Sequence, residues 1–144
     1  MLALEDLEGQ DEAQVRDHIV CAFEIEEKEL DGFEVLIAYE SVGSWGCDSS
    51  NWFLLRKGGL LYENHGGHCS CNGFEGQWAP EETSCDYLQS DKFYFPTGGY
   101  DNDTSGNEEA VEREINLIMN RIYPLTSRRQ AIMEQRARKE NSGV

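Results

Sequence analysis

The chain has 144 residues, and its 28 acidic side chains outnumber the 12 Lys and Arg side chains to give a formal net charge of −16. A surface this acidic repels a phosphate backbone, so direct binding to DNA or RNA is not expected. No apolar run approaches the length that a bilayer requires, so no membrane-spanning segment is predicted.

The charge is unevenly distributed, with an acidic body and a basic end. Residues 1–112 hold 25 acidic and 5 basic side chains, whereas residues 113–144 hold 3 acidic and 7 basic ones. An acidic body favours solubility or docking on a basic partner. The N-terminus lacks the basic and apolar regions of a secretory signal, and an odd number of cysteines, five, is typical of reduced thiols. We therefore expect a cytoplasmic protein.

The first predicted helix follows an acidic start. Residues 1–10 contain a few leucines among acidic side chains, and we expect them to fray. From Asp11 the apolar residues recur with a helical period and share one face: Val15, Ile19, Val20 and Phe23. Residues 24–31 are strongly acidic and favour one short turn of helix, which Gly32 would end.

Three strands are predicted next. Residues 33–39 are rich in strand-forming side chains. Residues 51–56 and 60–63 flank a Lys-Gly-Gly turn, which predicts a hairpin. The fold class is therefore predicted to be α+β, with a small three-stranded antiparallel meander, flanking helices and a C-terminal helical pair. The segment rich in His and Cys would leave the end of the third strand.

A helix is also predicted after the sheet. Pro80 and the two glutamates that follow it are residues that a helix N-terminus favours. The helix would cover about residues 81–89, with Tyr87 and Leu88 docking on the sheet. On this basis residues 11–96 form an acidic α+β core domain, residues 97–107 a flexible polar loop, and residues 108–140 a C-terminal helical extension.

The C-terminal extension is predicted to be a pair of helices. Ser105 and Glu108 form a capping-box signature. The helix behind them carries an apolar stripe: Val111, Ile115, Ile118, Met119 and Ile122. Pro124 ends this helix, and a basic helix follows over residues 127–139. The pair either packs on the sheet or projects from it, and a projecting pair predicts a homo-oligomer or a partner that covers the stripe.

Four of the eight thiol and imidazole side chains lie within seven residues: His65, His68, Cys69 and Cys71. These side chains bind zinc, and a tetrahedral site needs four of them. Cys69 and Cys71 would supply two ligands, and either histidine the third. Cys85 or Cys47 would supply the fourth. Because His68 and Cys69 are adjacent, the two side chains do not readily reach one ion. Structural zinc is one hypothesis for this segment.

A thiol nucleophile is a second hypothesis. Cys69 or Cys71 with His65 or His68, and with Glu75 as an acid, has the side-chain types of a thiolate catalyst. Sequence neighbours seldom form such dyads, because their side chains point apart. A third hypothesis is a packed loop without metal, in which the cysteines are small buried groups and His68 bonds to the backbone.

Trp45 is a separate candidate for protein binding. It lies in a polar loop, residues 41–50, and has no apolar cluster around it in the sequence. An exposed tryptophan of this kind is typical of an interface anchor. Most of the other aromatic side chains are expected to form the core of the small sheet.

Residues 67–83 contain the motif H-C-S-C-x-G-x-E-x-Q-W-x-P-E-E-T. The residues that match it are His68, Cys69, Cys71, Gly73, Glu75, Gln77, Trp78, Pro80, Glu81, Glu82 and Thr83. Together with residues 33–39 and 53–63, this segment resembles a group of small bacteriophage and prophage proteins that have no assigned activity. The resemblance covers roughly residues 24–88.

The resemblance implies a phage-encoded cytoplasmic protein whose working part is the segment 68–78. It makes Glu75, Gln77 and Trp78 candidate interaction residues, with Trp78 folding back over the loop. Neither Cys47 nor Cys85 belongs to the motif, which weakens a four-ligand zinc site within one chain. The resemblance implies no reaction.

The acidic body and this resemblance favour a non-enzymatic interaction protein. It would bind a host protein with a basic surface, such as a nucleic-acid enzyme or a defence complex, and inhibit or redirect it. One alternative is an enzyme that uses the Cys/His loop, as a thiol enzyme or a metal-dependent hydrolase. Another is a structural or assembly component of the phage.

Overall fold

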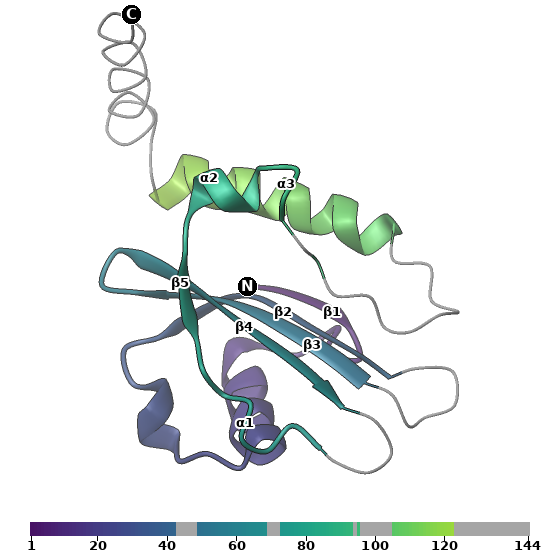
Figure 1. Cartoon of the computed structure of the whole chain (residues 1–144), viewed down its shortest axis with the longest axis vertical. Helices are drawn as coiled ribbons and strands as arrows, with labels where there is room; N and C mark the ends of the chain where they lie inside the picture. Colours follow the sequence, from purple (N-terminus) through teal and green to yellow (C-terminus); the bar gives the residue numbers. More distant parts are fainter. Residues whose placement is uncertain (43–48, 69–72, 94, 96–104, 123–144) are drawn as a thin grey trace, which may run out of the picture.

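Figure 1 shows the computed structural model, which describes residues 1–42, 49–68, 73–93, 95 and 105–122. In chain order its elements are β1 (Leu2–Glu5), α1 (Glu12–Phe23), the 3-10 helix η1 (Glu27–Leu30), β2 (Glu34–Val42), β3 (Ser49–Lys57), β4 (Leu60–His68), β5 (Glu81–Thr83), α2 (Cys85–Leu88) and α3 (Ser105–Ile122). A sheet lies between two helical layers, with α1 and η1 on one face and α2 and α3 on the other. Of the helices in the described part of the chain, none has the length and apolarity needed to cross a bilayer.

The sheet has five strands in the order β1-β2-β3-β4-β5. β1 pairs with β2 in parallel, and the other neighbouring strands pair antiparallel. The predicted α+β class is confirmed, and β2, β3 and β4 form the predicted meander. The prediction of a three-stranded, wholly antiparallel sheet is wrong, because one further strand pairs at each edge of the meander.

Alternation along β3 separates two apolar cores. Trp52 and Leu54 point to the side of α2 and α3, whereas Phe53 and Leu55 point to the side of α1. We call these the α3-side core and the α1-side core. The α3-side core includes the described part of the apolar stripe predicted on the C-terminal helix: Val111, Ile115, Ile118 and Met119. α3 therefore packs on the sheet.

The N-terminal residues form β1 and do not fray as expected. Leu2 and Leu4 pack on the α3-side core and Ala3 packs on the α1-side core, as the alternation of a strand requires. Leu2 lies opposite Ile37 of β2. Leu7, just beyond the strand, is buried in the α1-side core. Burial of these leucines on both sides of the sheet edge outweighs the acidic composition of the segment.

The helix predicted over residues 81–89 begins at Cys85 instead, because the residues before it pair with β4 as β5. This pairing satisfies backbone groups that the first turn of a helix would leave without partners. Ser84 then caps α2, and its Oγ accepts the N–H of Tyr87 at 3.1 Å. Tyr87 and Leu88 pack on the α3-side core, which confirms their predicted docking on the sheet.

The other predicted elements that fall within the described residues are present. α1 starts with a capping box, in which the Asp11 carboxylate accepts the N–H of Gln14 at 2.8 Å and the Gln14 side chain accepts the N–H of Asp11 at 2.9 Å. The buried face of α1 carries Val15, Ile19 and Phe23, as its periodicity predicts. The segment predicted as the basic helix, residues 127–139, lies outside the described residues.

Candidate functional site

The two histidines of the His/Cys segment lie on opposite faces of β4. The His65 ring is 6.4 Å from the ring of Trp52, on the α3 side of the sheet. The His68 ring is 4.5 Å from the ring of Phe74, on the α1 side. Successive side chains of a strand alternate between its faces, so residues three positions apart point away from each other. His65 and His68 therefore do not converge on one ion while β4 is intact.

The cysteines predicted as ligands are divided in the same way. Cys85 is buried in the α3-side core, across the sheet from His68. Cys47, Cys69 and Cys71 lie outside the described residues. Within the part of the chain that the structure describes, no group of three or more His, Cys, Asp or Glu side chains is arranged to hold a metal ion. The zinc and thiol-nucleophile hypotheses stay predictions.

The side chain of Gln77 joins the two ends of the Cys-containing segment. Its Oε1 accepts the N–H of Gly67 at 2.8 Å, and its Nε2 donates to the carbonyl oxygen of Gly67 at 2.8 Å. The same Nε2 lies 3.3 Å from the carbonyl oxygen of Gly73. The amide thus pairs with Gly67 as a neighbouring strand would, and it fixes the residues on both sides of segment 69–72.

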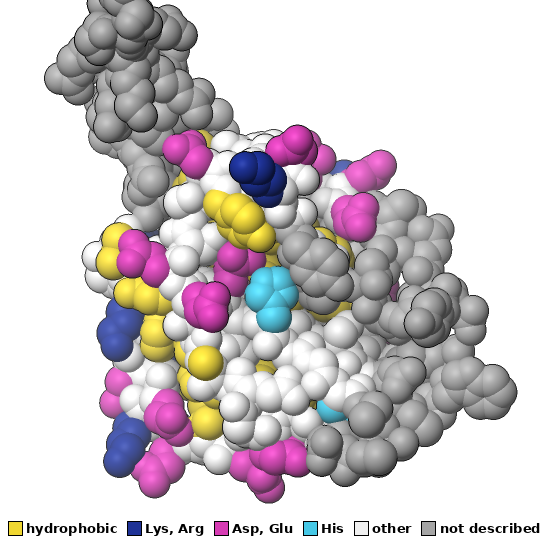
Figure 2. Space-filling model, viewed as in Figure 1, with side chains coloured by type: hydrophobic (Ala, Val, Ile, Leu, Met, Phe, Trp, Pro, Cys, Tyr) yellow, Lys and Arg dark blue, Asp and Glu magenta, His cyan; other side chains and the backbone are white. Residues whose placement is uncertain are grey.

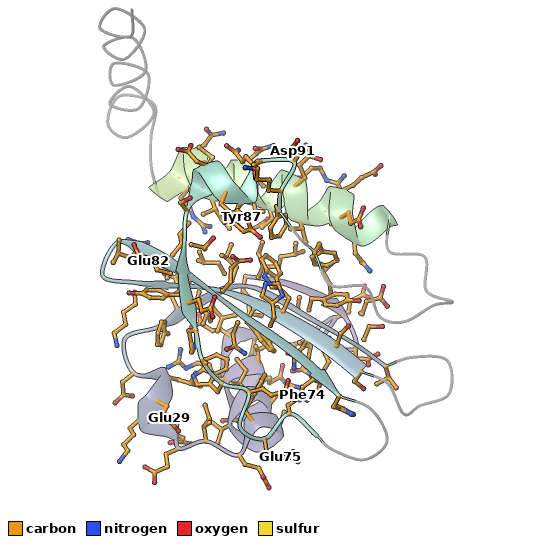
Figure 3. All side chains as sticks on the ribbon, in the orientation of Figure 1. Glu29, Phe74, Glu75, Glu82, Tyr87 and Asp91 are labelled. Carbon is orange, nitrogen blue, oxygen red and sulfur yellow. The ribbon has the colours of Figure 1, made fainter. Side chains whose placement is uncertain are left out.

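Glu75 is exposed and bonds back to the backbone beside it. Its carboxylate accepts its own backbone N–H and that of Gly73, which lies at 3.2 Å, and these bonds lower the pKa of the carboxyl group. A Cβ atom on Gly73 would lie 2.6 Å from the Glu75 carboxylate, so glycine leaves room for this arrangement. Figure 3 shows Glu75 at the outer edge of the molecule and Phe74 beside it, turned toward the sheet.

Trp78 packs inward beneath the sheet. Its ring lies 5.2 Å from the ring of Phe23 in α1 and 6.3 Å from the ring of Phe53 in β3. The backbone that follows is held by Asn64, whose Oδ1 accepts the N–H of Ala79 at 2.7 Å. The motif residues Gln77 and Trp78 therefore position the segment after the loop. Their predicted contact with a partner stays a prediction, and Trp45 lies outside the described residues.

A row of polar side chains crosses the α1 side of the sheet. Asn51 is fully buried, and its Nδ2 donates to the Glu40 carboxylate at 3.2 Å. His18 of α1 reaches the same carboxylate at 2.9 Å. This hydrogen bond, with the charges of Glu40 and Asp6, raises the pKa of His18 and outweighs the opposing effect of burial. A Cβ atom on Gly66 would lie 2.2 Å from Asn51 Oδ1, so glycine is needed beside this row.

On the α3 side, Glu63 lies in a polar depression of about 850 Å³ between β4 and the chain that runs into α2. Burial alone would raise the pKa of Glu63, but hydrogen bonds from His65 and Trp52 outweigh it and the pKa is lowered. Trp52 Nε1 donates at 2.9 Å, and His65 Nε2 lies at 3.4 Å. An ionised carboxylate at this position favours a cationic group in the depression.

A second depression, which we call the α2–α3 groove, has a cavity of about 690 Å³. Its floor consists of buried or half-buried apolar side chains: Leu88, Phe93, Phe95, Val111 and Ile115. Its rim carries three exposed carboxylates, those of Asp91, Glu108 and Glu112. Asp91 lies beside α2 and α3 in Figure 3. An apolar floor with an anionic rim suits a ligand that presents an apolar side chain between cationic ones.

Sequence reasoning missed both the buried polar row and the α2–α3 groove, since each combines residues from segments far apart in the chain. One local signal was present for the groove: Glu108 and Glu112 are four positions apart and share one face of a helix. Comparisons with protein-family models, with curated proteins and with solved structures found no match for this chain.

Proposed function

We propose that this is a phage-encoded, cytoplasmic interaction protein that binds a basic host protein and inhibits or redirects it. The host protein would be a nucleic-acid enzyme or a defence complex. The observation that carries the proposal is the charge of the body, because residues 1–112 hold 25 acidic and only 5 basic side chains. The phage origin is supported by the motif of residues 68–83.

Exposed side chains carry most of this negative charge. The segment around η1 is the densest part, with Glu24, Glu26, Glu27, Glu29, Asp31 and Glu34 all exposed. Lys28 is the basic residue within it, and its Nζ pairs with Glu26 at 2.9 Å. Figure 2 shows acidic side chains spread widely over one face of the molecule, with few Lys and Arg side chains between them.

A surface of this kind can occupy a groove that is built for nucleic acid. Lys and Arg side chains that normally contact phosphates would instead contact carboxylates, which carry the same sign of charge as the phosphates they replace. Long-range attraction would speed the encounter, and salt would weaken it. The same charge explains why direct binding of this chain to DNA or RNA is not part of the proposal.

Capture from host lysate tests the proposal. The tagged chain should retain a basic, nucleic-acid-binding protein at low salt and release it at high salt. The triple variant Glu26→Gln, Glu27→Gln and Glu29→Gln should retain less of it, because three exposed charges of the η1 segment are removed while side-chain size is kept. Capture of no basic protein, or capture that high salt does not affect, would count against the proposal.

A matched control separates local from general acidity. Glu81, Glu82 and Asp86 are also exposed, and they lie on β5 and α2. Changing these to Gln, Gln and Asn removes the same amount of charge from a different surface. Weaker capture by the η1 variant than by this control would place the contact near η1, whereas equal weakening would indicate that the field of the whole body provides the attraction.

A further inference from the structure

We infer that the α2–α3 groove is the docking site of the basic C-terminal segment, residues 127–139, folded back along α3 within the same molecule. The inference concerns an intramolecular contact and does not depend on the proposed function. It rests on three observations: the charge on the groove rim, the apolar groove floor, and the length of chain that follows α3.

Charge complementarity is the first observation. The rim of the groove presents Asp91, Glu108 and Glu112 to solvent. The segment 127–139 carries five basic side chains and one acidic side chain, Glu134, in a protein that is otherwise strongly acidic. A cationic segment tethered to an anionic body is attracted to the parts of that body where carboxylates gather.

The pattern of the segment matches the groove floor. In a helix, Ile132 shares a face with Arg128 and Arg129 on one side and with Arg136 and Lys139 on the other. One apolar side chain would thus lie between cationic ones, as the floor and rim of the groove require. The cavity of about 690 Å³ is large enough for a few side chains rather than a whole helix, so Ile132 would fill the floor and the basic side chains would reach the rim.

The chain length allows the segment to fold back. α3 ends at Ile122, and four residues, Tyr123 to Thr126, precede the segment. Short connections of this size join antiparallel helices. A 13-residue helix is about 20 Å long, so one that starts beside the end of α3 would run back past the whole groove. In that arrangement Ile132 lies near Ile115, and Lys139 lies near Glu108.

A short tether favours docking within one molecule over docking on a second copy. It holds the segment at an effective concentration on the order of millimolar, well above the micromolar concentrations at which proteins are usually handled. Weak contacts, such as a single apolar anchor and a few exposed ion pairs, are sufficient under those conditions.

Photo-crosslinking in the full chain tests the inference. The photoreactive residue p-benzoylphenylalanine replaces Gln135, which lies beside the proposed contact face, and an equal mixture of ¹⁴N and ¹⁵N chains is irradiated at low salt. Mass spectrometry should then find crosslinks to residues 88–95 or 108–116, and both peptides of each crosslink should carry the same isotope. Hybrid crosslinks between ¹⁴N and ¹⁵N peptides would overturn the inference in favour of a second copy. Crosslinks that avoid the groove would also overturn it.

A charge swap tests the contact independently. The variant Arg136→Glu and Lys139→Glu should lower the crosslink yield by roughly fivefold. A decrease of this size corresponds to the loss of about one exposed ion pair of good geometry. Adding Glu108→Lys and Glu112→Lys should restore at least half of the yield. The control is Glu81→Lys with Glu82→Lys, which changes exposed carboxylates outside the groove. Restoration by the control pair as well, or by neither pair, would contradict docking in the groove.

Discussion

Gln77 and Gly67 exchange two hydrogen bonds of 2.8 Å: the N–H of Gly67 donates to Gln77 Oε1, and Gln77 Nε2 donates to the carbonyl oxygen of Gly67. A glutamate at this position keeps the size of the side chain but lacks the N–H group that donates to the carbonyl oxygen. We therefore expect Gln77→Glu to lower the free energy of unfolding by about 0.5–1.5 kcal/mol. Urea denaturation followed by tryptophan fluorescence measures this change.

The control for this prediction is Gln89→Glu. Gln89 is exposed, and its Nε2 makes one hydrogen bond, to Asn116 Oδ1 at 2.6 Å. Loss of this hydrogen bond should change the free energy of unfolding by less than about 0.5 kcal/mol, since water can hydrogen-bond to the groups that the substitution leaves without a partner. If the two variants unfold at the same urea concentration, Gln77 does not stabilise the chain in the way that its hydrogen bonds indicate.

Gly66 is predicted to tolerate no side chain. A Cβ atom there would lie 2.2 Å from Asn51 Oδ1 and 2.9 Å from Phe74 Cδ1, and both of those residues are buried. Gly66→Ala should therefore destabilise the fold by about 2–4 kcal/mol, because packed side chains must shift. Gly67→Ala is the matched control, since the nearest atom to its Cβ would be a backbone oxygen at 3.9 Å. Equal melting temperatures for the two variants would show that Asn51 moves aside freely.

His18 is predicted to make stability depend on pH. Its pKa is raised, chiefly by the hydrogen bond to Glu40. A raised pKa means that the folded state binds the proton more tightly than the unfolded chain, so the stabilisation is complete below about pH 6.5 and is lost as pH rises through the folded pKa. The variant His18→Gln should lose this dependence. Urea midpoints for both proteins between about pH 5.5 and 8.5 provide the test, and parallel profiles would rule out the contribution of His18.

Metal content gives a prediction about the His/Cys segment. His65 and Cys85 lie on one side of the sheet and His68 on the other. We therefore expect protein purified without chelator to contain close to no zinc per chain, and its melting temperature to be unchanged by EDTA. Stoichiometric zinc would contradict this expectation. In that case His68→Ala, but not His65→Ala, should reduce the zinc content if the ion lies on the α1 side.

Helix α1 and the β3–β4 hairpin could be predicted because their signals lie within short stretches of the sequence. The helical period before Phe23 and the turn at Gly58-Gly59 are sequence-local signals, and both elements form where expected. β1 could not be predicted, because a four-residue edge strand forms through pairing with β2. Helix-favouring residues after Pro80 form β5 instead, since the open edge of β4 offers those residues backbone partners.

The sequence predicted where in the chain the candidate site lies, but it did not predict how the side chains of the site are arranged in space. The motif located the segment around Gln77, but the sequence placed the end of the third strand near Glu63. β4 in fact continues to His68, and this extension sends His65 and His68 to opposite faces. The row formed by Glu40 and Asn51 depends on the register between strands, which a single sequence does not specify.

The most direct test of the proposed function is competition with nucleic acid on the captured host protein. Fluorescent duplex DNA is bound to that protein, and the chain is titrated against it at two salt concentrations. We expect the chain to displace the DNA, and its inhibition constant, corrected for the affinity of the DNA at each salt concentration, to rise by at least about tenfold between 50 and 200 mM salt, because attraction between opposite charges is screened. Binding of the chain and the DNA together on one host protein would contradict the account, and so would a corrected inhibition constant that salt does not change.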